Sequence, residues 1–202
     1  MTRRQILKSA FSATGASLIL SRSHLSAQGS HSQRPGKFYE IAEAYEVYSA
    51  ILTEQWLEDR KIKLFLICTK TIPVEICFQP YGEWQEALRS AIGDYTELIK
   101  SNWILQPEFH LDRPYKLLPQ ETLAKAFAVE PGGNPLYRKY QDSGGRYYAF
   151  SPVGFNHDKT VGLVQMTYLC GSLCGLGQFH LLQKKSTKWL PLRLNNPCTW
   201  VS

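Results

Sequence analysis

Two segments of the chain carry apolar residues at helical spacing. Residues 37–57 predict an amphipathic helix, because apolar positions recur every three or four residues at Phe38, Ile41, Tyr45, Tyr48 and Ile51, with Leu57 near the end. Residues 83–102 predict a second helix, with apolar positions Trp84, Leu88, Ile92, Tyr95 and Leu98. A third, short helix is predicted up to Phe127, since Pro119 suits a first helical turn. The glutamates of the first helix fall mostly off its apolar face, which favours a solvated surface over acid–base chemistry.

The remaining apolar runs have the composition of strands. They cover residues 61–72 and 115–118, and then residues 146–155, 160–170, 175–185, 188–194 and 198–201. The last five runs are separated by turns of a few residues, so they predict antiparallel pairing. The runs 160–170 and 175–185 are apolar on both faces and should be central in the sheet. The sequence therefore predicts an α+β fold, with N-terminal helices packed on a mostly antiparallel sheet formed largely by a C-terminal β-meander.

A hairpin tip rich in cysteine and glycine lies between these two central strands. If Gly171, Ser172 and Leu173 form the turn, Cys170 and Cys174 lie opposite each other, where a Cα separation of about 4.5–5.5 Å suits a disulfide. Inert thiols and metal or redox use are the alternatives. The same register pairs residue 164 with His180, about 20 Å from the tip, so His180 cannot share a metal site with these thiols.

The N-terminal segment has the features of an export signal. Residues 2–8 (Thr-Arg-Arg-Gln-Ile-Leu-Lys) resemble the twin-arginine motif, with Arg3 and Arg4 as its arginine pair. The apolar stretch from Ala10 to Leu20 is too short and too weakly apolar to span a membrane stably. We expect residues 1–27 to be the signal peptide, residues 28–36 a flexible linker and residues 37–202 a single domain. The alternative is an N-terminal helix that belongs to the fold.

The positive charge of the chain is concentrated in this leader. The whole chain has a formal charge of +6, but residues 1–28 hold four basic residues and no acidic one. Their removal leaves 19 basic against 17 acidic residues, so we expect no nucleic-acid partner. Export places the domain in the periplasm or outside the cell, where the environment is oxidising and disulfides persist.

Other candidates for chemistry are isolated. Asn156-His157-Asp158 could include a catalytic His157, but asparagine and aspartate are the usual residues of a turn, which is the favoured interpretation. Neither His157 nor His180 stands in a sequence context typical of a general base, and the chain holds no nucleophile-elbow, zinc-protease or dinucleotide-binding motif. Cys198 could join the hairpin thiols. Residues 130–145, rich in glycine and proline, predict a long surface loop.

Three sequence blocks resemble a family of uncharacterised secreted bacterial proteins. They are Phe150-Ser151-x-Val153-Gly154-Phe155-Asn156-x-Asp158-x-Thr160, then Cys170-Gly171-x-Leu173-Cys174-Gly175-x-Gly177, and the terminal Trp200-Val201-Ser202. Residues 47–52 also resemble the first helix of that family. Cys198 lies outside the pattern. The resemblance implies an exported, single-domain protein, and it transfers no catalytic role and no cofactor.

These observations lead to two hypotheses of function. The favoured one is a non-catalytic exported domain that binds a protein or small-molecule ligand. The alternative is a small periplasmic enzyme or a metal or redox protein that uses Cys170, Cys174 and Cys198 as ligands or redox thiols. The sequence identifies no particular cofactor or substrate.

Overall fold

The structure is a computed structural model that describes residues 36–80, 84–129, 135–171, 174–192, 194 and 198–201. The predicted signal peptide, its two arginines and nearly all of the predicted linker lie outside the described residues. Among the described residues, no helix is both long and apolar enough to cross a membrane.

The helices are α1 (Ala42–Glu58), α2 (Gln85–Leu98), α3 (Gln120–Val129) and the short α4 (Pro135–Lys139). The first strands are β1 (Lys37–Phe38), β2 (Phe65–Cys68), β3 (Trp103–Ile104) and β4 (Tyr115–Leu118). The later strands are β5 (Tyr147–Phe150), β6 (Gly154–Phe155), β7 (Val161–Gly171), β8 (Cys174–Lys185), β9 (Lys188–Leu192) and β10 (Trp200–Val201).

The main sheet has the strand order β10-β8-β7-β5-β2-β4, and β6 and β9 pair with the outer parts of β7 and β8. The pairs from β5 onward are antiparallel, which confirms the predicted α+β fold with a C-terminal meander. By contrast, β2 pairs in parallel with both β4 and β5. Strand β2 therefore joins the sheet through long-range contacts, which no short turn in the sequence predicts.

The hairpin of β7 and β8 has the predicted register. Val164 lies opposite His180, and the pairing continues to Leu169 opposite Gly175. A bulge between Leu169 and Gly171 then brings Gly171 opposite Cys174. The predicted pairing of the two strands is therefore correct. The predicted three-residue turn is wrong in one detail, because the structure has a bulge before it.

Two details of the predicted elements are wrong. Residues 37 and 38 form a short strand parallel to β3, and the helix begins only at Ala42. The predicted long loop contains α4 and a 3-10 turn at Gln141–Ser143 among its described residues. Pairing of residues 37 and 38 with Trp103 and Ile104, far along the chain, overrides the helical spacing at Phe38. The predicted loop has no long apolar period, and short helical turns form there.

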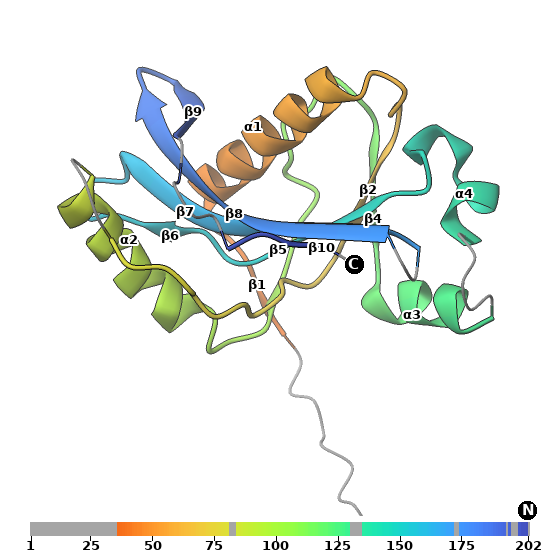
Figure 1. Cartoon of the computed structure of the whole chain (residues 1–202), viewed down its shortest axis with the longest axis horizontal. Coiled ribbons are helices and arrows are strands. Elements are labelled where there is room, and N and C mark those ends of the chain that lie inside the picture. Colours follow the sequence, from red (N-terminus) through yellow and green to blue (C-terminus); the bar gives the residue numbers. More distant parts are fainter. Residues whose placement is uncertain are drawn as a thin grey trace, which may run out of the picture. The chain divides into compact units, whose positions relative to one another are not determined.

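Helices cover the sheet on both faces (Figure 1). Helix α1 packs on the face that carries Val164, Met166 and Leu182, together with the buried tyrosines Tyr39, Tyr45 and Tyr48. Helix α2 packs on the opposite face, against Val161, Leu163, Phe179 and Leu181. Leu123 of α3 and Leu136 of α4 lie in a smaller cluster with Leu66 and Cys68 of β2. Strand β7 is therefore buried on both faces over its first seven residues, whereas most of β8 alternates between buried and half-buried positions.

Candidate functional site

The hairpin tip carries a disulfide between Cys170 and Cys174, whose Cα atoms are 5.1 Å apart. This distance fits the bond expected from the sequence. The bond closes a loop of only a few residues and lies at the end of the sheet. It stabilises the local geometry of the tip.

Cys198 is bonded to Cys77, with a Cα separation of 6.1 Å. The bond links the segment after β2 to the C-terminal segment, and Cys198 packs with the cluster under α2. The arrangement of three thiols considered in the sequence analysis is therefore not formed. Among the described residues, no group of three or more histidine, cysteine or acidic side chains is placed to hold a metal ion.

His180 and His157 lie apart from each other. His180 is half-buried in β8, where burial lowers the pKa of its imidazole to about 4, and its Nε2 lies 3.3 Å from the side-chain nitrogen of Gln178. His157 is exposed in the turn between β6 and β7. Asn156 organises that turn, since its Oδ1 accepts hydrogen bonds from the backbone N–H groups of Thr160 and Val161. The interpretation of Asn156-His157-Asp158 as a turn is confirmed.

A groove of about 690 Å³ lies between α1, residues 110–112 and the hairpin of β8 and β9. We call it the α1 groove. Its lining residues are Glu46, Ser49, Ala50, Thr53, Glu54, His110, Asp112, Thr187, Lys188, Trp189, Leu190 and Pro191. The five α1 residues are spaced by one, three or four positions, so they share one face of the helix. The groove therefore has a rigid helical wall and a wall formed by a two-stranded hairpin.

Glu46 joins these two walls. Its Oε2 accepts a hydrogen bond of 3.0 Å from the indole N–H of Trp189 and one of 3.1 Å from the Lys184 ammonium. The Lys184 ammonium also lies 5.5 Å from the centre of the Trp189 ring. The interpretation of Glu46 as a residue of a merely solvated face is therefore incomplete, because its carboxylate fixes the position of the groove floor.

Ser49 joins α1 to the third wall. Its hydroxyl donates to the Tyr45 carbonyl at 2.6 Å and accepts from the backbone N–H of His110 at 2.9 Å. The Tyr45 hydroxyl accepts from the backbone N–H of Gln106 at 2.8 Å, and burial raises the pKa of this phenol to about 12. These hydroxyls are thus used to hold the segment that contains His110 against the helix.

The floor of the groove is apolar and its margins are charged. Ala50, Trp189, Leu190 and Pro191 supply apolar surface, and Leu190 is 42% exposed. The lining carboxylates are Glu46, Glu54 and Asp112, whereas Lys188 is the lining lysine. None of the cysteine and histidine candidates from the sequence, which are Cys170, Cys174, Cys198, His157 and His180, lines this groove. Glu46 contacts Lys184 and Trp189, which lie 138 and 143 positions later in the sequence. Local spacing therefore could not reveal these contacts.

A second, smaller hollow of about 410 Å³ adjoins His157. Asp94 of α2, Asn156 and Lys159 also line it. One Asp94 oxygen accepts a 2.8 Å hydrogen bond from the backbone N–H of Phe155, and Lys159 pairs with Glu43 at 3.0 Å. These polar groups hold β6 and its turn against the two helices.

The fold and these contacts define an α+β domain with two disulfides and a groove between its first helix and a β-hairpin. Comparison of the chain with models of protein families, with curated proteins and with solved structures finds no match in any of the three. The functional argument therefore depends on the residues of the groove.

Proposed function

We propose that this protein is an exported, non-catalytic binding module whose α1 groove takes a ligand with an apolar part and a cationic group. The observation that carries the proposal is the combination of an apolar floor with acidic margins in one preformed groove. Its volume of about 690 Å³ lies within the usual range for small-molecule sites.

The apolar floor supplies the contact area for such a ligand. Trp189 is only 6% exposed, so it forms the base of the groove, while Leu190 and Pro191 border it toward solvent. Because Glu46 already holds the Trp189 indole, the floor does not have to be ordered when a ligand binds. A preformed site loses less conformational entropy on binding.

The charges favour a cation. Lys184 offsets the Glu46 carboxylate through its 3.1 Å ion pair. Asp112 adds an exposed carboxylate at the margin of the groove. The carboxylates at the margin would attract an ammonium or guanidinium group of the ligand, whereas they would repel a ligand carboxylate.

The polar groups of the groove support binding more than catalysis. The Ser49 hydroxyl and the Glu46 carboxylate are engaged in the hydrogen bonds that hold the walls together. A nucleophile or base needs its lone pair directed at a substrate. The metal or redox alternative is weakened separately, because Cys198 is bonded to Cys77.

Export through the twin-arginine pathway is the second part of the proposal. Two disulfides within the described residues are typical of a protein in an oxidising compartment. The motif at Arg3 and Arg4 and the basic, acid-free leader support the pathway. The test is the intact mass of protein recovered from the periplasm. A chain that begins at Gln28 is expected, and the double variant Arg3→Lys, Arg4→Lys should leave the uncleaved chain in the cytoplasm. Export that is unaffected by this double variant would contradict the pathway.

The groove is tested by a nuclear magnetic resonance titration of residues 28–202 with two probes of matched size, benzylammonium and phenylacetate. Benzylammonium should shift the amide signals of Ala50 and Leu190 and the indole signal of Trp189, with a dissociation constant of about 1 mM. Phenylacetate has the same ring and the opposite charge, and should bind more weakly. Equal binding of both probes, or shifts confined to another surface, would contradict the proposal.

A further inference from the structure

Residues 73–79 form an extended segment on the face of the sheet that α2 covers. Their side chains alternate, with Val74, Ile76 and Phe78 directed into the cluster under α2. The intervening residues Pro73, Glu75, Cys77 and Gln79 are exposed. This alternation is typical of a β-strand, although the segment belongs to none of the assigned strands.

The backbone of this segment has no ladder partner among the described residues. The preceding residues are paired: the Thr71 N–H donates to the Trp103 carbonyl at 3.0 Å, and the Ile72 N–H donates to the Phe150 carbonyl at 2.8 Å. From residue 74 to residue 79, no backbone N–H donates to another described residue. The Val74 carbonyl accepts a hydrogen bond of 2.7 Å from the Tyr95 hydroxyl. The segment thus resembles a sheet edge without a neighbouring strand in the part of the chain that the structure describes.

Three contacts hold the segment in this extended form. The Cys77–Cys198 disulfide fixes its middle, and the Tyr95 hydroxyl fixes its beginning. The Phe78 ring packs edge-on against Phe179 of β8, with 5.4 Å between the ring centres. An edge that is already extended loses little conformational entropy when another strand is added to it.

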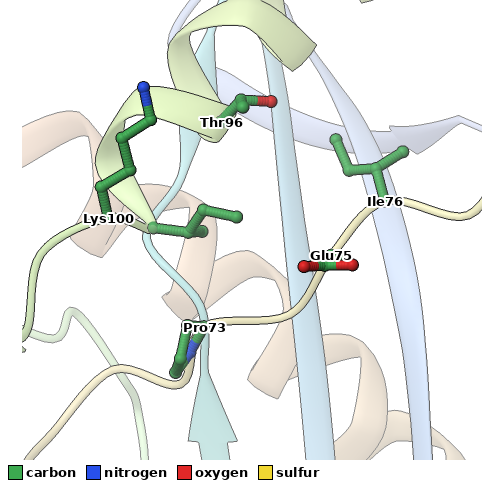
Figure 2. A pocket seen from close by; sticks show the side chains of 6 residues that line it. Pro73, Glu75, Ile76, Thr96 and Lys100 are labelled. Carbon is green, nitrogen blue, oxygen red and sulfur yellow. The ribbon is translucent and has the colours of Figure 1, made fainter.

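A hollow of about 590 Å³ lies beside the segment, between it and the C-terminal half of α2 (Figure 2). Its lining combines the apolar side chains of Pro73, Ile76 and Ile99 with Thr96, Glu75 and Lys100. Figure 2 shows Glu75 on the extended segment and Lys100, just after the end of α2, at the other side of the hollow. Lys100 is paired with Glu97, whereas the Glu75 carboxylate makes no ion pair with a described residue.

We propose that residues 73–79 accept an extended segment of another protein as an added β-strand. The occupant carries an apolar side chain for the hollow and a basic side chain that pairs with Glu75 across the strands. A row of backbone donors and acceptors is matched by another extended backbone. Opposite charges on facing strands stabilise such pairing, and like charges weaken it.

The charge also argues against a second copy of this chain as the occupant. Residues 73–79 contain one acidic residue and no basic residue. Pairing of two copies along this edge would set Glu75 opposite either a second Glu75 or an uncharged residue, without a compensating cation. A basic partner strand is therefore the better complement.

The test uses the peptide acetyl-Thr-Val-Lys-Val-Lys-Val-Thr-amide, with an otherwise identical peptide in which glutamates replace the lysines. On binding the lysine peptide, alternate amides among residues 75–79 should exchange with solvent about tenfold more slowly, because they become hydrogen-bonded. The glutamate peptide should bind about fivefold more weakly, and Glu75→Lys should reverse this preference. Glu75 is exposed, so this variant is expected to fold.

Two further peptides have the lysine sequence with the backbone N-methylated at alternate positions, one peptide for each edge of the strand. The peptide that is methylated on the edge facing residues 73–79 should not bind, because it keeps its side chains and loses only its backbone donors. Binding that survives methylation of both edges, or no added protection at residues 75–79, would overturn the proposal. Concentration-dependent dimerisation that protects these amides without peptide would instead identify a second copy and would also overturn it. The variant Asp112→Lys should bind the lysine peptide normally, which separates this site from the α1 groove.

Discussion

The indole nitrogen of Trp189 donates a 3.0 Å hydrogen bond to the carboxylate of Glu46, and this bond joins the hairpin of β8 and β9 to helix α1. Glu46→Ala should lower the free energy of unfolding by about 1–3 kcal/mol, because the buried indole loses its acceptor. Glu46→Gln keeps an acceptor and should lose less. The matched control is Glu43→Ala, one turn earlier, whose partner Lys159 is exposed. That change should cost at most about 1 kcal/mol. Urea denaturation of the three variants measures these differences, and equal losses for Glu43→Ala and Glu46→Ala would contradict the role of the indole bond.

Gly154 of β6 lies directly against α2. A Cβ at this position would be 2.3 Å from the carbonyl oxygen of Ala91 and 2.4 Å from the Cβ of Tyr95. Gly154→Ala must therefore displace the helix, and we expect a loss of about 3 kcal/mol or more in the free energy of unfolding. Gly93→Ala, on the same helix, is the control, because its Cβ would meet no atom within 4 Å. It should stabilise the protein by about 0.5–1 kcal/mol. Thermal denaturation decides the matter, and similar melting temperatures for the two variants would be inconsistent with this packing.

The two disulfides should differ in their contributions to stability. The Cys77–Cys198 bond closes a loop with a sequence separation of 121, whereas the Cys170–Cys174 separation is 4. Loop-closure entropy predicts losses of about 5 and about 2 kcal/mol when each pair is replaced by alanine. Urea denaturation of the two double variants provides the comparison. A larger loss for the hairpin pair would show that strain or residual structure outweighs loop length here.

Much of the fold could be predicted from apolar spacing. The periods at Tyr45, Tyr48, Leu88 and Tyr95 identify the two long helices, and a turn at residues 171–173 predicts the register of Val164 with His180. Those signals are local. The parallel pairing of β2 with β5 depends on contacts between residues about 80 positions apart and leaves no local pattern.

The candidate site was harder to predict for the same reason. The α1 groove exists because residues 110–112 and the β8–β9 hairpin fold back onto α1. Glu46 carries no sequence mark that separates it from Glu43, although the two have different partners. Cysteine and glycine make the hairpin tip conspicuous in the sequence. In the structure its tip is a bonded pair at the end of the sheet.

His180 should make stability depend on pH. Burial lowers the pKa of its imidazole from 6.5 to about 4 in the folded state. At a pH between these two pKa values, the unfolded chain binds more protons than the folded protein does. The stability from this group is therefore present above pH 6.5 and is lost as the pH falls toward 4. We expect the free energy of unfolding to fall by about 1–3 kcal/mol over this pH range. This range already allows for the solvent that reaches the half-buried ring.

Urea denaturation across this pH range tests the expectation on His180→Gln and His157→Gln. The first variant should remove that part of the pH dependence. The second should keep it, because His157 is exposed. An unchanged pH dependence in His180→Gln would assign the effect to other groups.

The affinity of benzylammonium for two charge-reversal variants tests the α1 groove most directly. Asp112→Lys changes the charge at the margin of the groove, whereas Glu86→Lys makes the same change on exposed α2. We predict that Asp112→Lys weakens binding by about tenfold, while Glu86→Lys leaves the dissociation constant at the wild-type value. Equal dissociation constants for the wild type and Asp112→Lys would contradict a cation site in the α1 groove.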